Sequence, residues 1–380
     1  MAEVMLFLPD LTIGGAERVV VNLFNHWTPE QRTKWTPTLV LRRHSGGLCD
    51  QLPSWVNVIT LNLPRAGLRS SIGTVWRLGM LMRRRHPQVI VAFHTATFST
   101  VVFASRFSSR RTKIVVSVNN PFSRFYGSAH TIRWKLFYKF ACKLTDCFWA
   151  VTPGIAEEMY SSFGIPKRKI TILHTSVDID HVSASRNTPV SHHAFDRSDV
   201  PVIITAGRLT AQKRLDVLLQ AASLLAPKNE FNLVIIGDGV LRERLEQLAS
   251  RLGISDRTFF VGFVPNLWAF ISKSSVFALA SDYEGFGNVL IEAMACGVPV
   301  VATRAPFGPE YVISNEENGL LVPTRDPNAL ANAMWRLLVD ADLRRRCIQG
   351  GFRRASDFSV ERVMQSFLAA LDDVVKEKSD

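Results

Sequence analysis

Two glutamates stand eight residues apart at the start of an apolar stretch in the second half of the chain. In D-Y-E-G-F-G-N-V-L-I-E-A-M-A-C-G-V-P-V-V-A-T, residues 282–303, Glu292 is the only polar side chain between Val289 and Cys296. A buried carboxylate without a partner costs several kcal/mol of folding free energy. The pattern therefore predicts a partner for Glu292, either a hydroxyl-bearing ligand or a Lys or Arg from a neighbouring element.

The residues between the two glutamates suit close contact with a ligand. Glu284 lies in a loop after the apolar segment V-F-A-L-A-S, and Gly285 and Gly287 allow the backbone to approach a bound molecule. A helix that begins near Asn288 would direct its free N–H groups toward a phosphate. The segment from Phe286 to Asn288 is therefore a candidate anion site.

Two cations follow an earlier predicted strand. In G-R-L-T-A-Q-K-R, Arg208 comes directly after the strand P-V-I-I-T-A, and Lys213 comes just before the next helix. An Arg and a Lys that project from the same sheet edge can clamp a diphosphate. Two cations at a strand end are also common on a solvated sheet edge, so both interpretations stay open here.

The first half of the chain has weaker candidates. The motif L-T-I-G-G-A-E-R places Gly14 and Gly15 between the first predicted strand and a helix, where a glycine pair suits the approach of a phosphate or a sugar. His94 follows the fourth predicted strand. It is a candidate ligand contact, and an ordinary strand-end histidine is equally compatible with the sequence.

These residues need a scaffold that brings strand ends together. The sequence predicts such a scaffold in each half of the chain. Short, continuously apolar strands alternate with helices, which indicates parallel sheets covered on both faces. The predicted strands are residues 4–9, 38–42, 57–61, 88–93, 113–118, 148–152, 201–206, 232–237, 258–262, 276–281 and 298–303. The predicted helices are residues 16–27, 71–85, 132–144, 155–163, 215–225, 241–252 and 289–295. The fold class is therefore α/β, with ligands bound beyond the carboxyl ends of the strands.

The length of 380 residues favours two domains over one core. We predict a first doubly wound, Rossmann-like domain over residues 1–182 and a polar linker over residues 183–200, which shows no periodic pattern. A second such domain follows over residues 201–355. A C-terminal helix over residues 356–380 is expected to pack back on the first domain.

Composition excludes several classes of protein. With 47% hydrophobic and 21% charged residues, the chain is globular and not disordered. Its five scattered cysteines predict neither a disulfide framework nor a zinc site and favour a reducing cytosol. The N-terminus has no basic region typical of a signal peptide. The uncharged residues 87–105 begin with Pro and include His94, so we do not expect them to span a membrane.

Taken together, the motifs resemble those of a known family. The glutamate pair with its C-G-V-P-V-V-A-T context, the G-R-L-x-x-x-K at 207–213, the G-D-G at 237–239 and the G-G-A-E-R at 14–18 are similar to those of family 4 retaining glycosyltransferases. The resemblance runs from the first strand to about residue 327. It implies the GT-B fold, in which two Rossmann-like domains face each other across a cleft, and the family includes enzymes of bacterial surface polysaccharides and lipid-linked glycans.

The resemblance also implies roles for the candidate residues. Arg208 and Lys213 would bind the diphosphate of a UDP- or GDP-linked sugar, Glu284 would contact the transferred sugar, and Glu292 would hold the ribose hydroxyls. Catalysis would rest on Glu284, Arg208 and Lys213, with retention of configuration and without a metal or other cofactor. The full set of expected donor-binding residues is Gly14, Gly15, Arg208, Lys213, Val264, Glu284, Phe286, Gly287, Asn288 and Glu292.

One position departs from many members of the family. After the fifth predicted strand they carry a His near the reacting sugar, whereas this chain reads V-V-S-V-N-N-P with Asn119 in that region. Asn119 and His94 are therefore the candidates for sugar or acceptor contacts, and which of them acts is left open.

The basic charge lies in the first half and suggests its partner. Residues 1–180 hold 23 Lys and Arg against 10 Asp and Glu, whereas the remaining residues hold 22 against 23. Residues 68–85 and 124–143 mix these cations with aromatic and aliphatic side chains, which suits the headgroup region of an anionic bilayer. We therefore expect a peripheral enzyme on the cytoplasmic membrane face with a glycan or lipid-linked acceptor, and no nucleic-acid partner. The alternative is that the apolar faces only pack on the sheet.

Other functions account for fewer of the sequence features. A sugar-nucleotide epimerase of the same architecture would need acid–base residues at the sugar ring, and none can be identified. A non-catalytic membrane-associated adaptor would explain the basic half but not the glutamate pair. The G-D-G at 237–239 lacks the third glycine of a dinucleotide fingerprint, which disfavours a nicotinamide oxidoreductase. Asp178 and Asp180 form a D-x-D at the domain junction, where a magnesium site is not expected.

Overall fold

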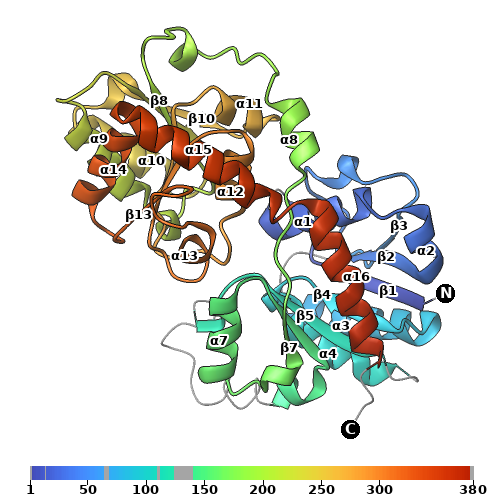
Figure 1. Ribbon diagram of the computed structural model, residues 1–380. Coiled ribbons are helices and arrows are strands. Elements are labelled where there is room, and N and C mark those ends of the chain that lie inside the picture. Colours follow the sequence, from blue (N-terminus) through green and yellow to red (C-terminus); the bar gives the residue numbers. More distant parts are fainter. Residues whose placement is uncertain (1, 13, 64–67, 109–111, 124–139, 377–380) are drawn as a thin grey trace. The chain divides into compact units, whose positions relative to one another are not determined.

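The computed structural model describes residues 2–12, 14–63, 68–108, 112–123 and 140–376. The chain divides into two compact units, Met1–Ser176 with Val360–Asp380, and Val177–Ser359. Each unit is a parallel sheet flanked by helices (Figure 1). The two predicted doubly wound α/β domains are therefore confirmed as a fold class. The chain enters the second unit at Val177 and leaves it at Ser359. These two residues form an isolated parallel bridge.

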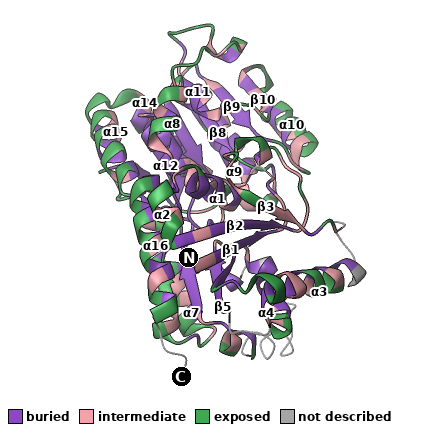
Figure 2. Ribbon diagram, turned by 90° about the vertical axis from the view of Figure 1, so that its right-hand side faces the viewer, coloured by how far each residue is buried: buried purple, intermediate pink, exposed green. Residues whose placement is uncertain are grey.

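The first unit contains a seven-stranded parallel sheet in the order β3-β2-β1-β4-β5-β6-β7. Its central strands are apolar on both faces, since helices cover both sides, and Figure 2 shows them as buried. The strands are β1 (Ala2–Leu8), β2 (Trp35–Leu41), β3 (Asn57–Thr60), β4 (Val89–Ala92), β5 (Lys113–Val118), β6 (Cys147–Ala150) and β7 (Ile170–Ile172). The helices are α1 (Gly15–Asn25), α2 (Pro29–Lys34), α3 (Leu68–Arg85), α4 (Phe98–Ala104), α7 (Pro153–Ser161) and α16 (Val360–Lys376).

The last helix completes the core of the first unit. The ring of Phe367 on α16 packs edge-on against Trp27 at 5.7 Å and against Trp149 at 5.3 Å, measured between ring centroids. Met364 and Leu371 are buried in the same core. About three apolar side chains of this size contribute several kcal/mol through burial. This contact explains why residues at the C-terminus belong to the unit that begins the chain.

The second unit contains a six-stranded parallel sheet in the order β10-β9-β8-β11-β12-β13. The strands are β8 (Val202–Ala206), β9 (Asn232–Ile236), β10 (Thr258–Gly262), β11 (Val276–Leu279), β12 (Val300–Thr303) and β13 (Leu320–Val322). The helices are α8 (Ile179–Ser185), α9 (Leu215–Leu225), α10 (Arg242–Arg251), α11 (Leu267–Ser272), α12 (Asn288–Ala295), α13 (Pro309–Val312), α14 (Pro327–Val339) and α15 (Ala341–Ser356). The outer faces of helices such as α10 are exposed, whereas Leu245 and Ala249 on its inner face are buried (Figure 2).

Local sequence signals set where several helices begin. At α7 the Thr152 hydroxyl accepts a hydrogen bond from the Ile155 N–H, and Pro153 occupies the first turn. At α14 the Asp326 carboxylate accepts from the Ala329 N–H, and Pro327 follows it. Such caps satisfy backbone donors that the helix leaves free, and each contributes about 1 kcal/mol.

Strand order places a switch point in each sheet. The direction of winding reverses between β1 and β4 in the first unit and between β8 and β11 in the second. Ligands bind at such points in doubly wound sheets because the loops there leave in opposite directions. The glycine pair at 14–15 and His94 follow β1 and β4, and the loops that carry Arg208 and Glu284 follow β8 and β11. The predicted motifs therefore occur at both switch points.

Most predicted elements are confirmed, with differences at the edges. The three-residue strands β7 and β13 were missed, and so were the helices α2, α4, α8, α11, α13, α14 and α15. The predicted polar linker contains the end of α8 and the 3₁₀ turn His193–Phe195. Residues 87–105 form β4 and α4. The predicted helix over residues 132–144 lies mainly outside the described residues. In the part of the chain that the structure describes, none of the helices has the length and apolar character needed to cross a bilayer.

Candidate active site

The loop after β8 presents the two predicted cations. Gly207 has a φ of +152°, which side chains rarely adopt, and a Cβ there would lie 3.2 Å from Lys213 Cε, so glycine suits this close approach. A Cβ on Gly237, after β9, would collide with the Gly207 carbonyl oxygen. Arg208 and Lys213 consequently line the same small pocket at the carboxyl ends of β8, β9 and β11.

Lys213 meets the first glutamate of the pair. Its Nζ lies 2.5 Å from Glu284 Oε1, and the Ser281 hydroxyl donates a hydrogen bond to the same oxygen at 2.6 Å. The Thr303 hydroxyl in turn donates to the Ser281 carbonyl oxygen at 2.6 Å. Both charged side chains are largely buried, with exposed fractions of 16% and 9%. The carboxyl group of Glu284 is therefore held in one orientation beside a cation.

The second glutamate is buried as the apolar run predicted. Glu292 lies on α12 with 8% of its surface exposed. The pKa of the neighbouring Cys296 thiol is raised to about 12, mainly by burial and secondarily by the Glu292 charge. Cys296 thus stays protonated near neutral pH and is no nucleophile. The assignment of Glu292 to a ribose remains a prediction.

The amino end of α12 is the candidate anion site. Its N-cap is Gly287, with a φ of +89°, and no side chain caps this end. Phe286 is buried, and its ring packs edge-on against Phe358 at a centroid distance of 5.0 Å. Phe286 can therefore contribute only its backbone to an anion site, together with Gly287 and Asn288. The amino terminus of a helix attracts anions, because the N–H groups of its first turn point outward along the helix axis.

Arg208 and Val264 occupy the same sheet edge. The Arg208 side chain is exposed, and within the described parts of the chain its guanidinium has neither a hydrogen bond nor an ion pair. An exposed, uncommitted guanidinium can turn to a diphosphate without breaking an existing contact. Val264 is half-buried in the loop after β10, which lies two strands away from β8 in the sheet.

The first unit has its own polar group at the switch point. His94 Nε2 lies 2.8 Å from Glu17 Oε1, which joins the loop after β4 to the first turn of α1. Gly14 precedes this turn, and a Cβ there would collide with Glu17 Oε2. Asn119 Nδ2 donates to the Phe93 carbonyl oxygen at 2.7 Å, so Asn119 supports the residue before His94.

Glu17 was not recognised from the sequence as a site residue. It stands in the quoted G-G-A-E-R motif, and a glutamate two residues after a glycine pair at a helix start is the signal that could have identified it. The structure shows Glu17 buried, with 7% of its surface exposed. Because its carboxylate accepts the Nε2–H of His94, a neutral His94 presents Nδ1 as a hydrogen-bond acceptor.

The D-x-D at the junction has a structural explanation. The Asp178 carboxylate accepts a hydrogen bond from the His181 N–H at 2.9 Å and caps α8. Across the described residues no group of three or more His, Cys, Asp or Glu side chains is placed to hold a metal ion.

Comparison with known proteins identifies the family. Residues 13–181 match the model of Glycosyltransferase Family 4, and residues 192–354 match that of Glycosyl transferases group 1. The lipopolysaccharide core biosynthesis glycosyltransferase LpsE of Rhizobium meliloti is 33% identical over 60% of this chain and 64% of its own length, slightly less than two thirds. LpsD of the same organism is 28% identical over 95% of this chain and 96% of its own.

Solved structures show the same fold. HepE of Anabaena in complex with UDP and glucose superposes with a TM-score of 0.78, covering 98% of this chain and all of that one at 20% identity. The lipopolysaccharide outer core galactosyltransferase WaaB superposes with a TM-score of 0.75 at 19% identity, covering 98% and 99% of the two chains. With both halves of the chain matched and each half built on a doubly wound parallel sheet, the chain belongs to the family 4 glycosyltransferases of GT-B fold.

Proposed function

We propose that the protein transfers a hexosyl or N-acetylhexosaminyl group, with retention of configuration, from a UDP- or GDP-linked sugar to a lipid-linked glycan. The observation that carries this proposal is the Lys213–Glu284 pair, which lies beside Arg208 at the switch point of the second sheet. It offers two cations to a diphosphate and one oriented carboxylate to a sugar.

The proposed chemistry follows from the charges that develop. As the bond from the anomeric carbon to the diphosphate oxygen breaks, the sugar ring becomes positive and the diphosphate becomes more negative. The acceptor hydroxyl oxygen bonds to that carbon, and its proton passes to the departing diphosphate oxygen. Arg208, Lys213 and the backbone at the start of α12 would stabilise the leaving group. These fixed positive groups provide the neutralisation that a metal ion supplies elsewhere, so no metal is required.

The Lys213–Glu284 pair also avoids the cost of an isolated buried ion, since each charge satisfies the other. A bound donor would draw Lys213 toward its diphosphate and leave the Glu284 carboxylate to accept hydrogen bonds from hydroxyls of the transferred sugar. Glu292, on the same helix as the anion site, would hold the ribose.

Named relatives support the donor and acceptor classes. A Campylobacter jejuni relative, 26% identical over 71% of this chain and 73% of its own, is an N-acetylgalactosaminyltransferase acting on a diphospho-undecaprenol glycan. HepE binds UDP and glucose. We infer a comparable pairing here, a nucleotide sugar with a glycan carried on a lipid.

The first unit would contribute the acceptor contacts through His94. Replacing Glu17 with Gln should raise the acceptor KM about tenfold, the effect of losing one hydrogen bond to a charged or oriented group, and leave the donor KM unchanged. His94→Gln should do the same. Steady-state kinetics with each substrate varied separately measure this. An unchanged acceptor KM in both variants, or an equal rise in both KM values, would remove His94 from the acceptor site.

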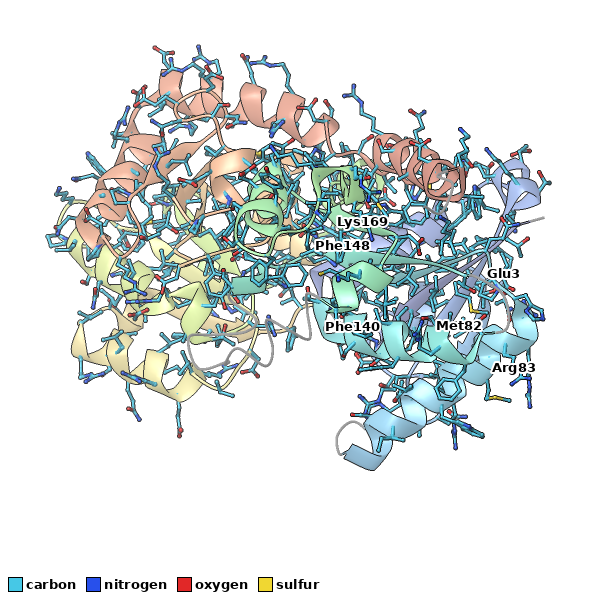
Figure 3. The ribbon with its side chains drawn as sticks, turned by 90° about the horizontal axis from the view of Figure 1, so that it is seen from below. Glu3, Met82, Arg83, Phe140, Phe148 and Lys169 are labelled. Carbon is cyan, nitrogen blue, oxygen red and sulfur yellow. The ribbon has the colours of Figure 1, made fainter. Side chains whose placement is uncertain are left out.

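Membrane attachment is supported by charge and by exposed apolar side chains of the first unit. Residues 51–145 contain 15 Lys and Arg and no Asp or Glu. On α3, Ile72 and Trp76 are 61% and 55% exposed, and Phe103 and Phe107 of the neighbouring segment are each 45% exposed. Met82 is buried in the unit's core, whereas the adjacent Arg83 is exposed (Figure 3). Most of the second predicted basic segment, residues 124–139, lies outside the described residues.

We therefore expect the protein to bind the cytoplasmic face of the cell membrane. In vitro, it should bind vesicles that contain anionic lipid. Trp76→Ala combined with Arg83→Ala should weaken binding about fivefold or more, since each basic residue near the surface contributes about 1 kcal/mol. Flotation with vesicles containing phosphatidylglycerol measures it, and Phe352→Ala, an exposed aromatic of α15, is the matched control. Equal flotation with neutral and anionic vesicles at low salt would instead favour a soluble acceptor.

The proposed activity is tested by incubating the purified protein with UDP- and GDP-sugars and undecaprenyl-diphosphate glycans. We expect release of nucleoside diphosphate together with an elongated glycan. A donor sugar that changes its stereochemistry without acceptor would identify an epimerase. Binding to vesicles with no donor turnover would identify a non-catalytic adaptor.

A further inference from the structure

Backbone strain is concentrated around one loop of the second unit. Among the described residues other than glycine, positive φ angles occur at Asn62, His86, Arg214, Phe307, Glu316 and Arg325. Side chains disfavour this region, so a protein retains them there only where something compensates. Arg214, Phe307 and Arg325 follow the carboxyl ends of β8, β12 and β13, with φ angles of 47°, 79° and 60°.

All three strained residues contact the loop that follows β11. Arg325 donates from Nε and Nη2 to the two carboxylate oxygens of Asp282 at 2.9 and 2.8 Å. Arg214 donates from Nε and Nη2 to the Asp216 carboxylate at 2.9 and 2.8 Å, and its remaining Nη1 lies 3.6 Å from Asp282 Oδ2. The backbone of Phe307 forms an isolated parallel bridge with Glu284. The loop after β11 is therefore contacted by one residue with a strained backbone from each of the three loops that follow β8, β12 and β13.

Two hydrogen bonds join the loop after β8 to the loop after β11. The Asp282 N–H donates to the Gln212 carbonyl oxygen at 2.9 Å, and Gln212 Nε2 donates to the Tyr283 carbonyl oxygen at 2.9 Å. Gln212 immediately precedes Lys213. Anything that holds Asp282 therefore also sets the distance between Lys213 and Glu284.

We infer that Arg214, Arg325 and Phe307 are positioning residues that clamp the loop at 282–284 and hold Glu284 in its productive orientation. Glycine at position 214 or 325 would remove the strain but could not reach Asp282, so the side-chain contact is what the strain maintains there, whereas Phe307 contributes its backbone bridge to Glu284. The hydrogen bond from Arg325, and secondarily the Arg214 charge, hold the pKa of Asp282 below its usual range against the opposing effect of burial. The clamp rests on the proposed role of Glu284.

Two glycine substitutions on either side of one strand test the clamp. Arg325→Gly removes the strained residue and its pair with Asp282 after β13. Glu316→Gly is the control before β13. It removes a residue with a φ of 66° and its ion pair with Arg336, which measures 2.7 Å. Both variants should keep or raise the melting temperature. Only Arg325→Gly should lower kcat, by about tenfold, because a displacement of about 1 Å at a reacting centre can cost up to a hundredfold.

Hydrogen–deuterium exchange of residues 281–287 provides a readout independent of turnover. Exchange should be faster in Arg325→Gly and Arg214→Gly than in the wild type, and unchanged in Glu316→Gly. Asp282→Asn should match Arg325→Gly, and combining the two should add little, since both remove one interaction. Wild-type exchange and kcat in Arg325→Gly would overturn the clamp. If instead Glu284→Gln retained full turnover, the proposed function would fail, whatever the exchange of the loop.

Discussion

Replacing Glu284 with Gln removes nearly all turnover while the protein stays folded. We expect kcat to fall about 10²- to 10³-fold, the loss typical of removing one preorganised charged group from a transition state. Gln has the shape of Glu and can accept the Ser281 hydroxyl, so the loop should keep its conformation. Initial rates with donor and acceptor measure the loss, and Glu243→Gln on the exposed face of α10 is the control.

The same variant should bind nucleoside diphosphate at least as tightly as the wild type. Glu284 Oε1 lies 2.5 Å from Lys213 Nζ, and its charge would compete with a diphosphate for that lysine. Removing the charge frees the cation. Calorimetry with UDP and GDP tests this, and weaker binding together with normal kcat would place Glu284 in nucleotide binding and outside catalysis.

Removing either cation weakens nucleoside diphosphate binding, but with different effects on stability. Arg208→Ala and Lys213→Ala should each lower the affinity for UDP or GDP about 10- to 100-fold, as expected for a lost hydrogen bond between charged groups. Arg208 is exposed, so its variant should keep the free energy of unfolding within about 0.5 kcal/mol of the wild type. Lys213→Ala leaves the Glu284 carboxylate buried without its cation, which costs about 3 kcal/mol.

Calorimetry and denaturant unfolding separate these two effects. Arg244→Ala, which removes an exposed cation from α10, controls for the general loss of positive charge. Adding Glu284→Gln to Lys213→Ala should restore much of the lost stability, since no buried charge is then left alone. Unchanged affinity in both single variants would contradict the proposed diphosphate clamp.

The sequence predicts the sheet edge well because its signals are local. The strand that ends at Ala206 and the helix at Asn288 are marked by apolar runs and glycines within a few residues, and parallel topology then brings strand ends together. Burial of Glu292 follows from its neighbours along the chain. These features need no knowledge of distant contacts.

The contacts within the site could not be read in the same way. Lys213 and Glu284 lie 71 positions apart in the chain, and their pairing depends on the register of β8 with β11. The sequence suggested a ligand for both residues without indicating that each holds the other. Glu17 was missed for the same reason, since its partner His94 is 77 positions away.

Backbone conformation was the least predictable feature. Nothing in the residue types of Arg214, Phe307 or Arg325 indicates a left-handed φ, which is normally a glycine signal. The short strand β13 was also missed, because three residues give no period that distinguishes a strand from a loop. Both features bear on how the loop at 282–284 is held.

The central claim is transfer of a sugar with retention, and the anomeric configuration of the product tests it most directly. Proton NMR of the glycan made by the wild-type protein from an α-linked UDP- or GDP-sugar should show an α linkage at the new glycosidic bond, with the small coupling between H1 and H2 expected for gluco- or galacto-configured sugars. A β linkage from the same donor would contradict the proposed mechanism and the roles given to Arg208, Lys213 and Glu284.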